Sequence, residues 1–171
     1  MQSENQYLYE EMVANQMLIM ELLAEVDELK AKELVQNNNF VAISVVYNTE
    51  DDDVDDSGYV SVEGKYQIIS LTDTFKVSVR PFVNTTGEAG GALTVDAKLS
   101  DKLTVGAGAG VVGSWSDSSA LAGDDEVAGY GQAAIDYNLS DETVITVNGR
   151  VPFTGDNSGD VQVGVGVGIR F

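Results

Sequence analysis

The last eleven residues of the chain, VQVGVGVGIRF (161–171), alternate strictly between two kinds of side chain. Val, Ile and the final Phe occupy the odd-numbered positions, while Gln, Gly and Arg occupy the even-numbered ones. Because the side chains of a β-strand point alternately to its two faces, this stretch is predicted to be a strand. One of its faces is apolar, and the other is polar or carries no side chain.

The same period of two extends back to Phe40. It marks eight predicted strands, which cover residues 40–47, 59–70, 74–83, 92–99, 102–115, 127–139, 142–153 and 161–171. Alternation alone fits two architectures. In a soluble sandwich the apolar faces meet in a core, whereas in a membrane barrel the apolar face contacts lipid.

The connections between the predicted strands favour a barrel. Short turns at 71–73, 100–101 and 140–141 alternate with long links at 48–58, 84–91, 116–126 and 154–160. Short turns at one end and longer loops at the other are typical of an up-and-down membrane barrel. The turns also share one pattern, Leu-Thr-Asp at 71–73 and Leu-Ser-Asp at 99–101 and 139–141, which indicates a repeated hairpin.

The aromatic residues of the apolar face gather near the two ends of the strands. Those near the short turns are Tyr66, Phe75, Tyr137 and Phe171, and those near the long links are Tyr47, Trp115 and Phe153. A bilayer has two interfaces that attract aromatic side chains, whereas a soluble core gives no reason to sort them to both rims. The aromatic pattern therefore favours an eight-stranded transmembrane barrel.

The polar face carries charges of both signs. Because the interior of an eight-stranded barrel is narrow and filled by side chains, these charges are predicted to pair inside it. The predicted lumen charge network comprises Glu63, Lys65, Lys76, Arg80, Asp96, Lys98, Asp136, Arg150 and Arg170.

Two runs of alternating glycine, at 106–110 and 164–168, lie on this same polar face. Their spacing does not fit a phosphate-binding loop. The missing side chains are expected to leave room for Arg80, Phe82 and Tyr130 to cross the lumen. The alternative is a water-filled path along the wall. Since eight-stranded barrels usually fill their interiors, we expect a plugged lumen.

Residues 1 to about 36 follow a different period. Positions separated by steps of four and three form the seam of a coiled coil, and they are Leu8, Met12, Asn15, Ile19, Leu22, Val26 and Leu29. We therefore expect an amphipathic, coiled-coil-like helix over residues 1–39 and a barrel over residues 40–171. A second copy or a helical partner is expected to contact residues 5–36. The alternative is a helix docked on its own barrel.

The composition excludes several classes of function. The 171 residues include 9 basic and 28 acidic residues, giving a net charge of −19, and neither Cys nor His. Thiol chemistry and a Ser-His-Asp site are therefore excluded, and the acidic balance argues against nucleic acid as a partner. A mean hydropathy of −0.04 argues against a bundle of transmembrane helices. We expect no enzymatic activity and no cofactor.

Acidic residues concentrate in the predicted loop at 50–56. Asp53, Asp55 and Ser57 precede Gly58 in the manner of the first half of a Ca²⁺-binding loop. Gly64 stands where an EF-hand requires Glu. A solvated acidic loop is therefore the default expectation, and weak binding of a divalent cation such as Ca²⁺ is the alternative.

Residues 40–171 resemble the small eight-stranded outer-membrane β-barrels of Gram-negative bacteria, the OmpA/OmpX-like proteins. Members of that family commonly end in an aromatic residue preceded by apolar residues at alternate positions, which the barrel-assembly machinery recognises. The matching residues here are Val163, Val165, Val167, Ile169 and Phe171. This chain departs from the family in two ways, since no export signal is visible in its first residues and a helix precedes the barrel.

The resemblance implies an outer-membrane barrel with a structural, anchoring role. Its helix is expected to lie on the periplasmic side, where the short turns are, and to mediate oligomerisation or partner binding. Three alternatives remain open at this point. The chain could form a narrow outer-membrane pore, a phage virion protein that inserts into the host envelope, or a soluble acidic β-protein with an oligomerising stalk.

Overall fold

The computed structural model describes residues 17, 19–25, 39–49, 58–115, 121–122, 127–154 and 160–171. The chain divides into two units, Met1–Asn37 and Asn38–Phe171. In the first unit, residues 17 and 19–25 are helical, and the rest of the predicted N-terminal helix lies outside the described residues. No helix in the described part of the chain is long and apolar enough to cross a membrane.

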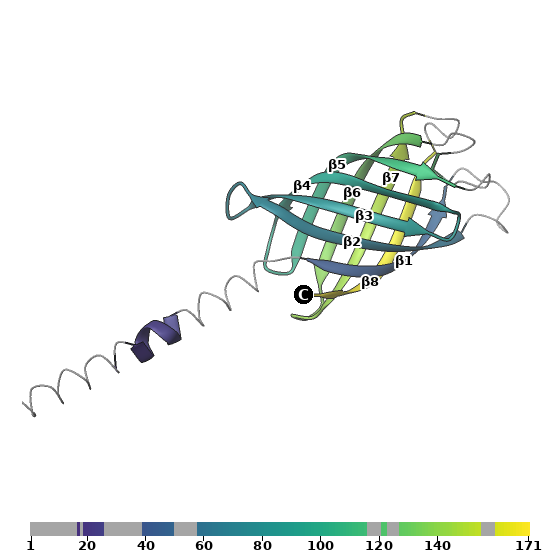
Figure 1. Ribbon diagram of the computed structural model, residues 1–171. Helices are drawn as coiled ribbons and strands as arrows, with labels where there is room; N and C mark the ends of the chain where they lie inside the picture. The colour runs from purple at the N-terminus through teal and green to yellow at the C-terminus, as the bar shows by residue number, and fades with distance from the viewer. Residues whose placement is uncertain are drawn as a thin grey trace, which may run out of the picture. The chain divides into compact units, whose positions relative to one another are not determined.

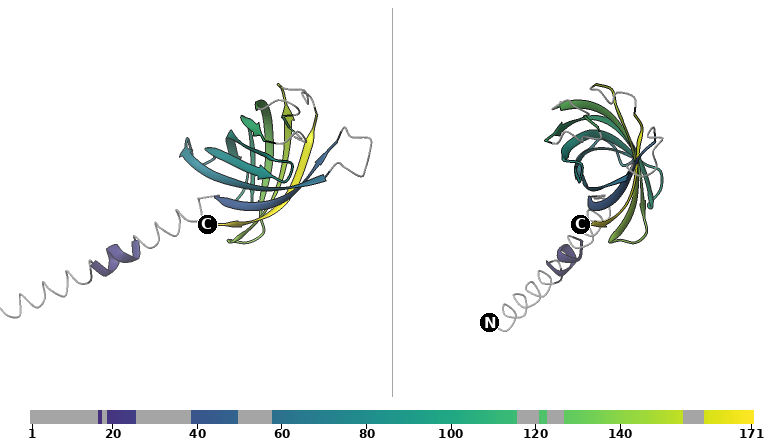
Figure 2. Two further views of the ribbon diagram at one scale, coloured as in Figure 1. Left: turned by 45° about the vertical axis from the view of Figure 1, so that its right-hand side comes forward. Right: turned by 90° about the vertical axis from the view of Figure 1, so that its right-hand side faces the viewer.

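The second unit is a closed barrel of antiparallel strands (Figures 1 and 2). The strands are β1 (Phe40–Asn48), β2 (Gly58–Ser70), β3 (Phe75–Asn84), β4 (Glu88–Lys98), β5 (Leu103–Ser114), β6 (Val127–Asn138), β7 (Thr143–Pro152) and β8 (Gln162–Arg170). Each strand pairs with its neighbours in the sequence, and β1 pairs with β8 to close the ring. The predicted eight-stranded up-and-down barrel is confirmed.

The pairing of β1 with β8 follows from the alternation in both strands. Ile43 lies opposite Val167 and Val45 opposite Val165, so the apolar faces of the two strands coincide. A slip of one residue would turn every glycine of β8 toward the apolar face, which fixes the register. Beyond β8, the Phe171 ring lies 5.8 Å from the Tyr66 ring. Closure in this way leaves no free sheet edge.

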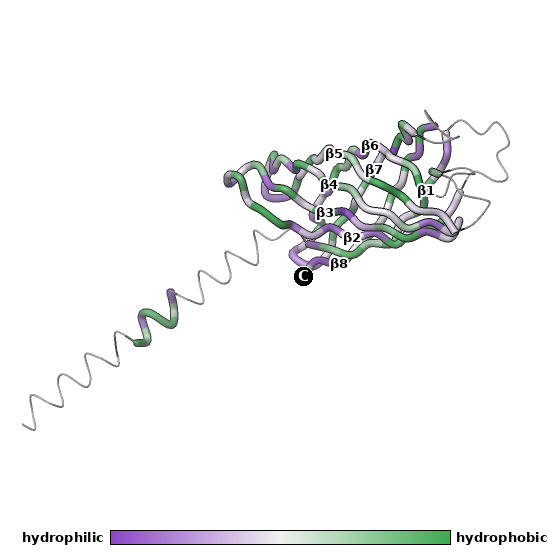
Figure 3. Tube along the Cα trace, turned by 45° about the horizontal axis from the view of Figure 1, so that its top comes forward, coloured by the Kyte–Doolittle hydropathy of each residue, from purple (hydrophilic) through white to green (hydrophobic). Residues whose placement is uncertain are grey.

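The apolar face of the barrel is its outer surface. Leu93, Val95 and Val167 are each more than half exposed, whereas the alternate residues Thr94 and Asp96 are buried. Figure 3 shows hydrophobic and hydrophilic residues succeeding one another along individual strands. This distribution is the reverse of that in a soluble barrel and matches the lipid-facing surface of a membrane barrel.

The aromatic residues that the sequence analysis sorted to two girdles are all exposed. Their exposed fractions are 41% for Tyr66, 46% for Phe75, 42% for Tyr137 and 57% for Phe171 at the short-turn end, and 55% for Tyr47, 65% for Trp115 and 58% for Phe153 at the other end. The aliphatic residues of the outer surface therefore lie between two aromatic bands, as in transmembrane barrels.

The three short turns have one common hydrogen-bond pattern. The backbone N–H groups of Leu71, Leu99 and Leu139 donate to the carbonyl oxygen four residues later, over 2.9–3.0 Å. In each turn the next residue, Thr72, Ser100 or Ser140, accepts two backbone N–H bonds on its side-chain oxygen. The repeat seen in the sequence is thus a repeated turn, closed by a local side-chain cap.

One predicted connection is wrong. The sequence analysis placed a long link at residues 84–91, but β4 already begins at Glu88, and residues 85–87 form a tight turn with Gly87 at φ 83°. Gly90 and Gly91, which the sequence analysis placed in that link, belong to β4 instead. Gly90 pairs with Phe82, and a Cβ there would lie 2.8 Å from the Phe82 ring, so the glycine accommodates that ring. The strict alternation of long and short links therefore fails at this point.

Candidate functional site: the barrel lumen

Four charged side chains from four strands meet inside the barrel, and we call them the central cluster. Lys65 Nζ lies 2.8 Å from Asp136 Oδ2 and 3.2 Å from Asp96 Oδ2. Arg80 Nη2 lies 2.6 Å from Asp136 Oδ2 and 3.3 Å from Asp96 Oδ1. None of the four side chains is more than 5% exposed. Two cations and two carboxylates thus balance one another away from water.

Hydroxyl groups donate additional hydrogen bonds to the carboxylates of the central cluster. Ser78 Oγ donates to Asp96 Oδ2 over 2.6 Å, and Thr94 Oγ1 donates to Asp96 Oδ1 over 3.1 Å. Thr146 Oγ1 donates to Asp136 Oδ1 over 2.9 Å. Additional hydrogen bonds help to offset the cost of burying ions, so this arrangement is that of a structural network.

A second group of polar side chains, which we call the Arg150 cluster, lies nearer the long loops. Arg150 Nη2 lies 2.8 Å from Glu63 Oε2, and Asn148 Nδ2 donates to both oxygens of Glu63 over 2.8 and 2.9 Å. Ser44 also donates to Glu63. The Arg150 guanidinium stacks 4.2 Å from the centre of the Phe82 ring. This stacking places the charged Arg150 side chain against the apolar side chains of the lumen.

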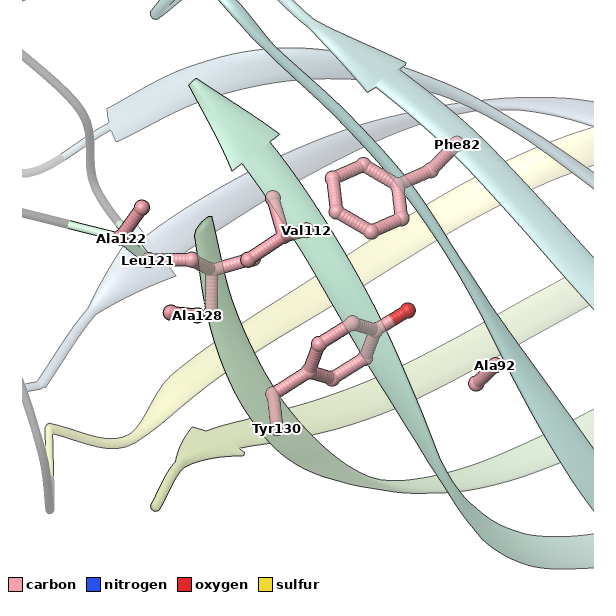
Figure 4. Close-up of a cluster of buried hydrophobic side chains, with 7 residues drawn as sticks. All are labelled: Phe82, Ala92, Val112, Leu121, Ala122, Ala128 and Tyr130. Carbon is pink, nitrogen blue, oxygen red and sulfur yellow. The ribbon is translucent and has the colours of Figure 1, made fainter. Parts of the chain in front are cut away.

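Apolar side chains also occupy the lumen (Figure 4), and one of them is Phe82, on which Arg150 stacks. The Phe82 and Tyr130 rings meet edge to face with centroids 5.9 Å apart, and both are buried. Leu121 and Ala122, from the link between β5 and β6, are buried in the same cluster. As expected from the sequence, Arg80, Phe82 and Tyr130 all enter the lumen.

The alternating glycines do not line an empty path. A Cβ at Gly106 would overlap the Asp96 carboxylate, and a Cβ at Gly108 would overlap the backbone carbonyl of Leu93 in the neighbouring strand. In β8, a Cβ at Gly166 would overlap the Ser44 hydroxyl. Glycine at these positions therefore allows neighbouring strands to approach closely and leaves room for the side chains of the lumen.

The nine residues of the predicted charge network occupy three places. Six form the two clusters described above, and the other three, Lys76, Lys98 and Arg170, lie at the short-turn end of the lumen wall. Lys76 is buried. Lys98 reaches the rim, where its ammonium lies 2.8 Å from the fully exposed Asp101 and lowers the pKa of that carboxyl.

The lumen also holds a functional residue that the sequence analysis missed. Glu88 is fully buried, and its Oε1 accepts the backbone N–H groups of Leu121 over 2.6 Å and Ala122 over 3.1 Å. Its Oε2 accepts from Asn84 and Thr86. Glu88 thereby holds part of the β5–β6 link inside the barrel mouth. Its alternation with Thr94 and Asp96 along one face was the available signal, but the sequence analysis had assigned it to a loop.

Replacing Glu88 by glutamine is expected to loosen this link. The neutral amide accepts less strongly from the N–H groups of Leu121 and Ala122, so we expect their hydrogen exchange to accelerate about ten- to a hundredfold. Exchange followed by NMR in micelles measures this. The matched control is Glu142→Gln in an exposed turn, and equal exchange in both variants would show that the Glu88 charge does not hold the link.

The other predicted site residues are only partly described. In the helical seam, Ile19 and Leu22 are 56% and 51% exposed. The remaining seam residues and the candidate cation ligands lie outside the described residues: Leu8, Met12, Asn15, Val26, Leu29, Asp53, Asp55 and Ser57. No group of acidic residues in the described part of the chain could hold a metal ion. The five C-terminal pattern residues all face outward.

Comparison with known proteins identifies the fold. No family model matches the chain, and no curated protein does. A de novo designed transmembrane β-barrel matches with a TM-score of 0.53 and 19% identity, over 80% of this chain and 96% of the designed one. The outer membrane protein Ail of Yersinia pestis, in a phospholipid bilayer nanodisc, matches with a TM-score of 0.51 and 12% identity, over 78% of this chain and all of Ail. The chain thus has the fold of a transmembrane β-barrel.

Proposed function

We propose that this transmembrane barrel is a structural anchor in the outer membrane of a Gram-negative bacterium. Its N-terminal helix binds a second copy or a helical partner on the periplasmic side. The observation that carries the proposal is the filled lumen, in which the two charge clusters and the Phe82 and Tyr130 rings are buried.

Two features support the outer membrane. Closed, even-numbered, up-and-down barrels are characteristic of that membrane, and their short turns face the periplasm. Strand β1 begins at the short-turn end of this barrel, so the chain that precedes Phe40 departs from that end. The outward-facing Val163–Phe171 pattern at the C-terminus agrees with recognition by a barrel-assembly machinery.

The contents of the lumen favour an anchor over a narrow pore. A conducting path past Arg80 or Arg150 would require these cations to leave their carboxylates at 2.6–2.8 Å. Separating a buried ion pair exposes uncompensated charge in a low-dielectric interior, which is costly. A lumen that is filled and ion-paired in this way favours an anchoring role over the passage of solutes.

Purified full-length chain mixed with lipid vesicles tests the anchor. We expect unheated samples to migrate differently from boiled ones on a gel, because the folded barrel resists the detergent. We expect no steady conductance in planar bilayers. Steady single-channel conductance would replace the anchor by the pore, and a chain that ignores lipid and shows no shift would contradict a membrane barrel.

Replacing Ile19 and Leu22 together by glutamine tests the role of the helix. Both side chains are more than half exposed, and apolar seam residues drive coiled-coil association. We expect crosslinked oligomers to disappear, or a helical partner to be lost from pull-downs, while the gel shift of the barrel remains.

The matched control replaces Glu21 and Glu25 by glutamine in the same helix. These exposed residues lie off the seam, so association should persist. Oligomers or partner binding that survive in the Ile19→Gln, Leu22→Gln variant would contradict the association role of the helix. The barrel would then anchor only its own loops in the membrane.

A further inference from the structure

At the short-turn end the lumen opens into a pocket that neither charge cluster fills. Its lining consists of Lys65, Gln67, Lys76, Ser78, Asp96, Lys98 and Thr104. The space between these side chains is about 220 Å³, including the part that is open to solvent. The 30% exposed Lys98 side chain marks the open side, and the buried Lys76 lies deeper.

We propose that this pocket binds a phosphate-type oxyanion, either free phosphate or the phosphate of a lipid headgroup. The inference goes beyond the anchoring role and does not depend on association of the helix. It rests on the lining of the pocket, on the excess of lysines over carboxylates in that lining, and on an amide group with unused hydrogen-bonding capacity.

Lysines outnumber carboxylates among the residues that line the pocket. Three of its lining residues are lysines, and Asp96 is the single carboxylate among them. Asp96 is already engaged by Lys65 and Arg80 in the central cluster. The Lys76 ammonium is repelled by those of Lys98 and Lys65 and attracted by the Asp73 carboxylate. A bound anion would relieve this repulsion at short range, where water screens it least.

The chain as a whole has a net charge of −19, so a pocket lined by three lysines stands out against this background. The carboxylate nearest to Lys98, that of Asp101, is 95% exposed and therefore weakly held. An oxyanion that contacts both Lys98 and Lys76 would form two charge-assisted hydrogen bonds, which are stronger than neutral ones.

The side chain of Gln67 supplies a further binding group. Its Oε1 is buried and has no hydrogen-bond partner among the described residues, while its Nε2 donates to Ser70. Oε1 can accept from the hydroxyl of a protonated free phosphate. A headgroup phosphodiester carries no such hydroxyl, and for it a turn of the amide would present Nε2 as a donor. The pocket has room for about one water molecule between its side chains, so the anion is expected at the solvent-exposed side, next to Lys98.

Titration of the folded full-length chain with inorganic phosphate in a nonionic detergent tests the site. Chloride at equal ionic strength is the reference. We expect phosphate to raise the thermal midpoint of the wild type, because a ligand of the folded state stabilises it. In Lys98→Met the apparent Kd should weaken about tenfold, as for one lost charge-assisted bond.

Lys102→Met is the matched control, because Lys102 is an exposed lysine at the same end and does not line the pocket. It should bind phosphate like the wild type, and Lys98→Arg should restore binding. If the buried Lys76→Met variant fails to fold, the Lys98 and Lys102 variants still decide the question. Equal loss in Lys98→Met and Lys102→Met would reduce the effect to general surface charge and overturn the proposal.

Nanodiscs distinguish the two sources of phosphate. Native mass spectrometry of protein released from phosphatidylglycerol nanodiscs in phosphate-free buffer reports retained lipid. Lipid retained by the wild type and lost in Lys98→Met identifies a headgroup site, whereas a phosphate shift without retained lipid identifies a free oxyanion. No difference between wild type and Lys98→Met in either arm would overturn the proposal, without bearing on the anchor.

Discussion

Replacing Asp136 by asparagine is expected to lower the free energy of unfolding of the barrel by about 3–5 kcal/mol, the usual cost of breaking a buried ion pair. Asp136 contacts both cations of the central cluster, at 2.8 Å from Lys65 and 2.6 Å from Arg80. Asparagine keeps the shape but leaves these two buried cations with Asp96 alone. The uncompensated charge is poorly solvated, because every member of the cluster is buried.

Urea unfolding in micelles measures this loss through Trp115, the single tryptophan, which lies on the outer surface. Asp141→Asn, at an exposed turn carboxylate, is the matched control and should stay within about 0.5 kcal/mol of the wild type. A loss of less than about 1 kcal/mol in Asp136→Asn would mean that the central cluster does not hold the lumen closed.

A double variant separates loss of charge balance from loss of packing. Adding Arg80→Met to Asp136→Asn removes one cation together with one anion, so Lys65 and Asp96 remain as a neutral pair 3.2 Å apart. We expect part of the stability to return, because replacement of a whole buried ion pair costs less than removal of one partner. A double variant that is less stable than Asp136→Asn would assign the effect to packing of the Arg80 side chain.

Replacing Leu93 by arginine is expected to destabilise the barrel by about 2–4 kcal/mol in a bilayer. Leu93 lies midway along β4, faces outward and is 59% exposed. If that outer surface contacts the hydrocarbon core, the arginine must be desolvated or reach for an interface. Unfolding from vesicles, followed by the gel shift and Trp115 fluorescence, measures the effect.

Leu99 offers a matched control for this substitution. It is also a leucine, it is 61% exposed, and it lies just beyond the end of β4 at the short turns. Near an interface the same arginine should cost only about 0–1 kcal/mol. Equal effects at Leu93 and Leu99 would contradict a bilayer centred on the strands, since a uniformly solvated surface treats the two positions alike.

The sequence alone was sufficient to predict the faces of most strands, because a period of two is a local property of an extended chain. Val165 and Val167 face outward and Gly166 inward for this reason alone. The turns were equally local, since the oxygens of Thr72, Ser100 and Ser140 bond to N–H groups only two and three residues away.

Local reasoning was wrong where a glycine has a tertiary role. The sequence analysis placed Gly90 and Gly91 in the link at 84–91, but they lie in β4 opposite Phe82 and Pro81. Only the paired strand shows that the Phe82 ring occupies the space of a missing side chain at Gly90. The same error removed Glu88 from β4 and hid its hold on Leu121 and Ala122.

The sequence by itself thus determined a barrel with a polar inside and an apolar outside, together with the residues available to its lumen. Only the tertiary structure decided which charges meet. Lys65 and Asp136 are 71 residues apart in the chain, and Arg150 and Glu63 are 87 apart. The pairing of β1 with β8 and the register of each pair of strands set the depth of these charged side chains in the lumen. Which charges attract each other depends on their distance in space, and a pattern along the sequence does not contain that distance.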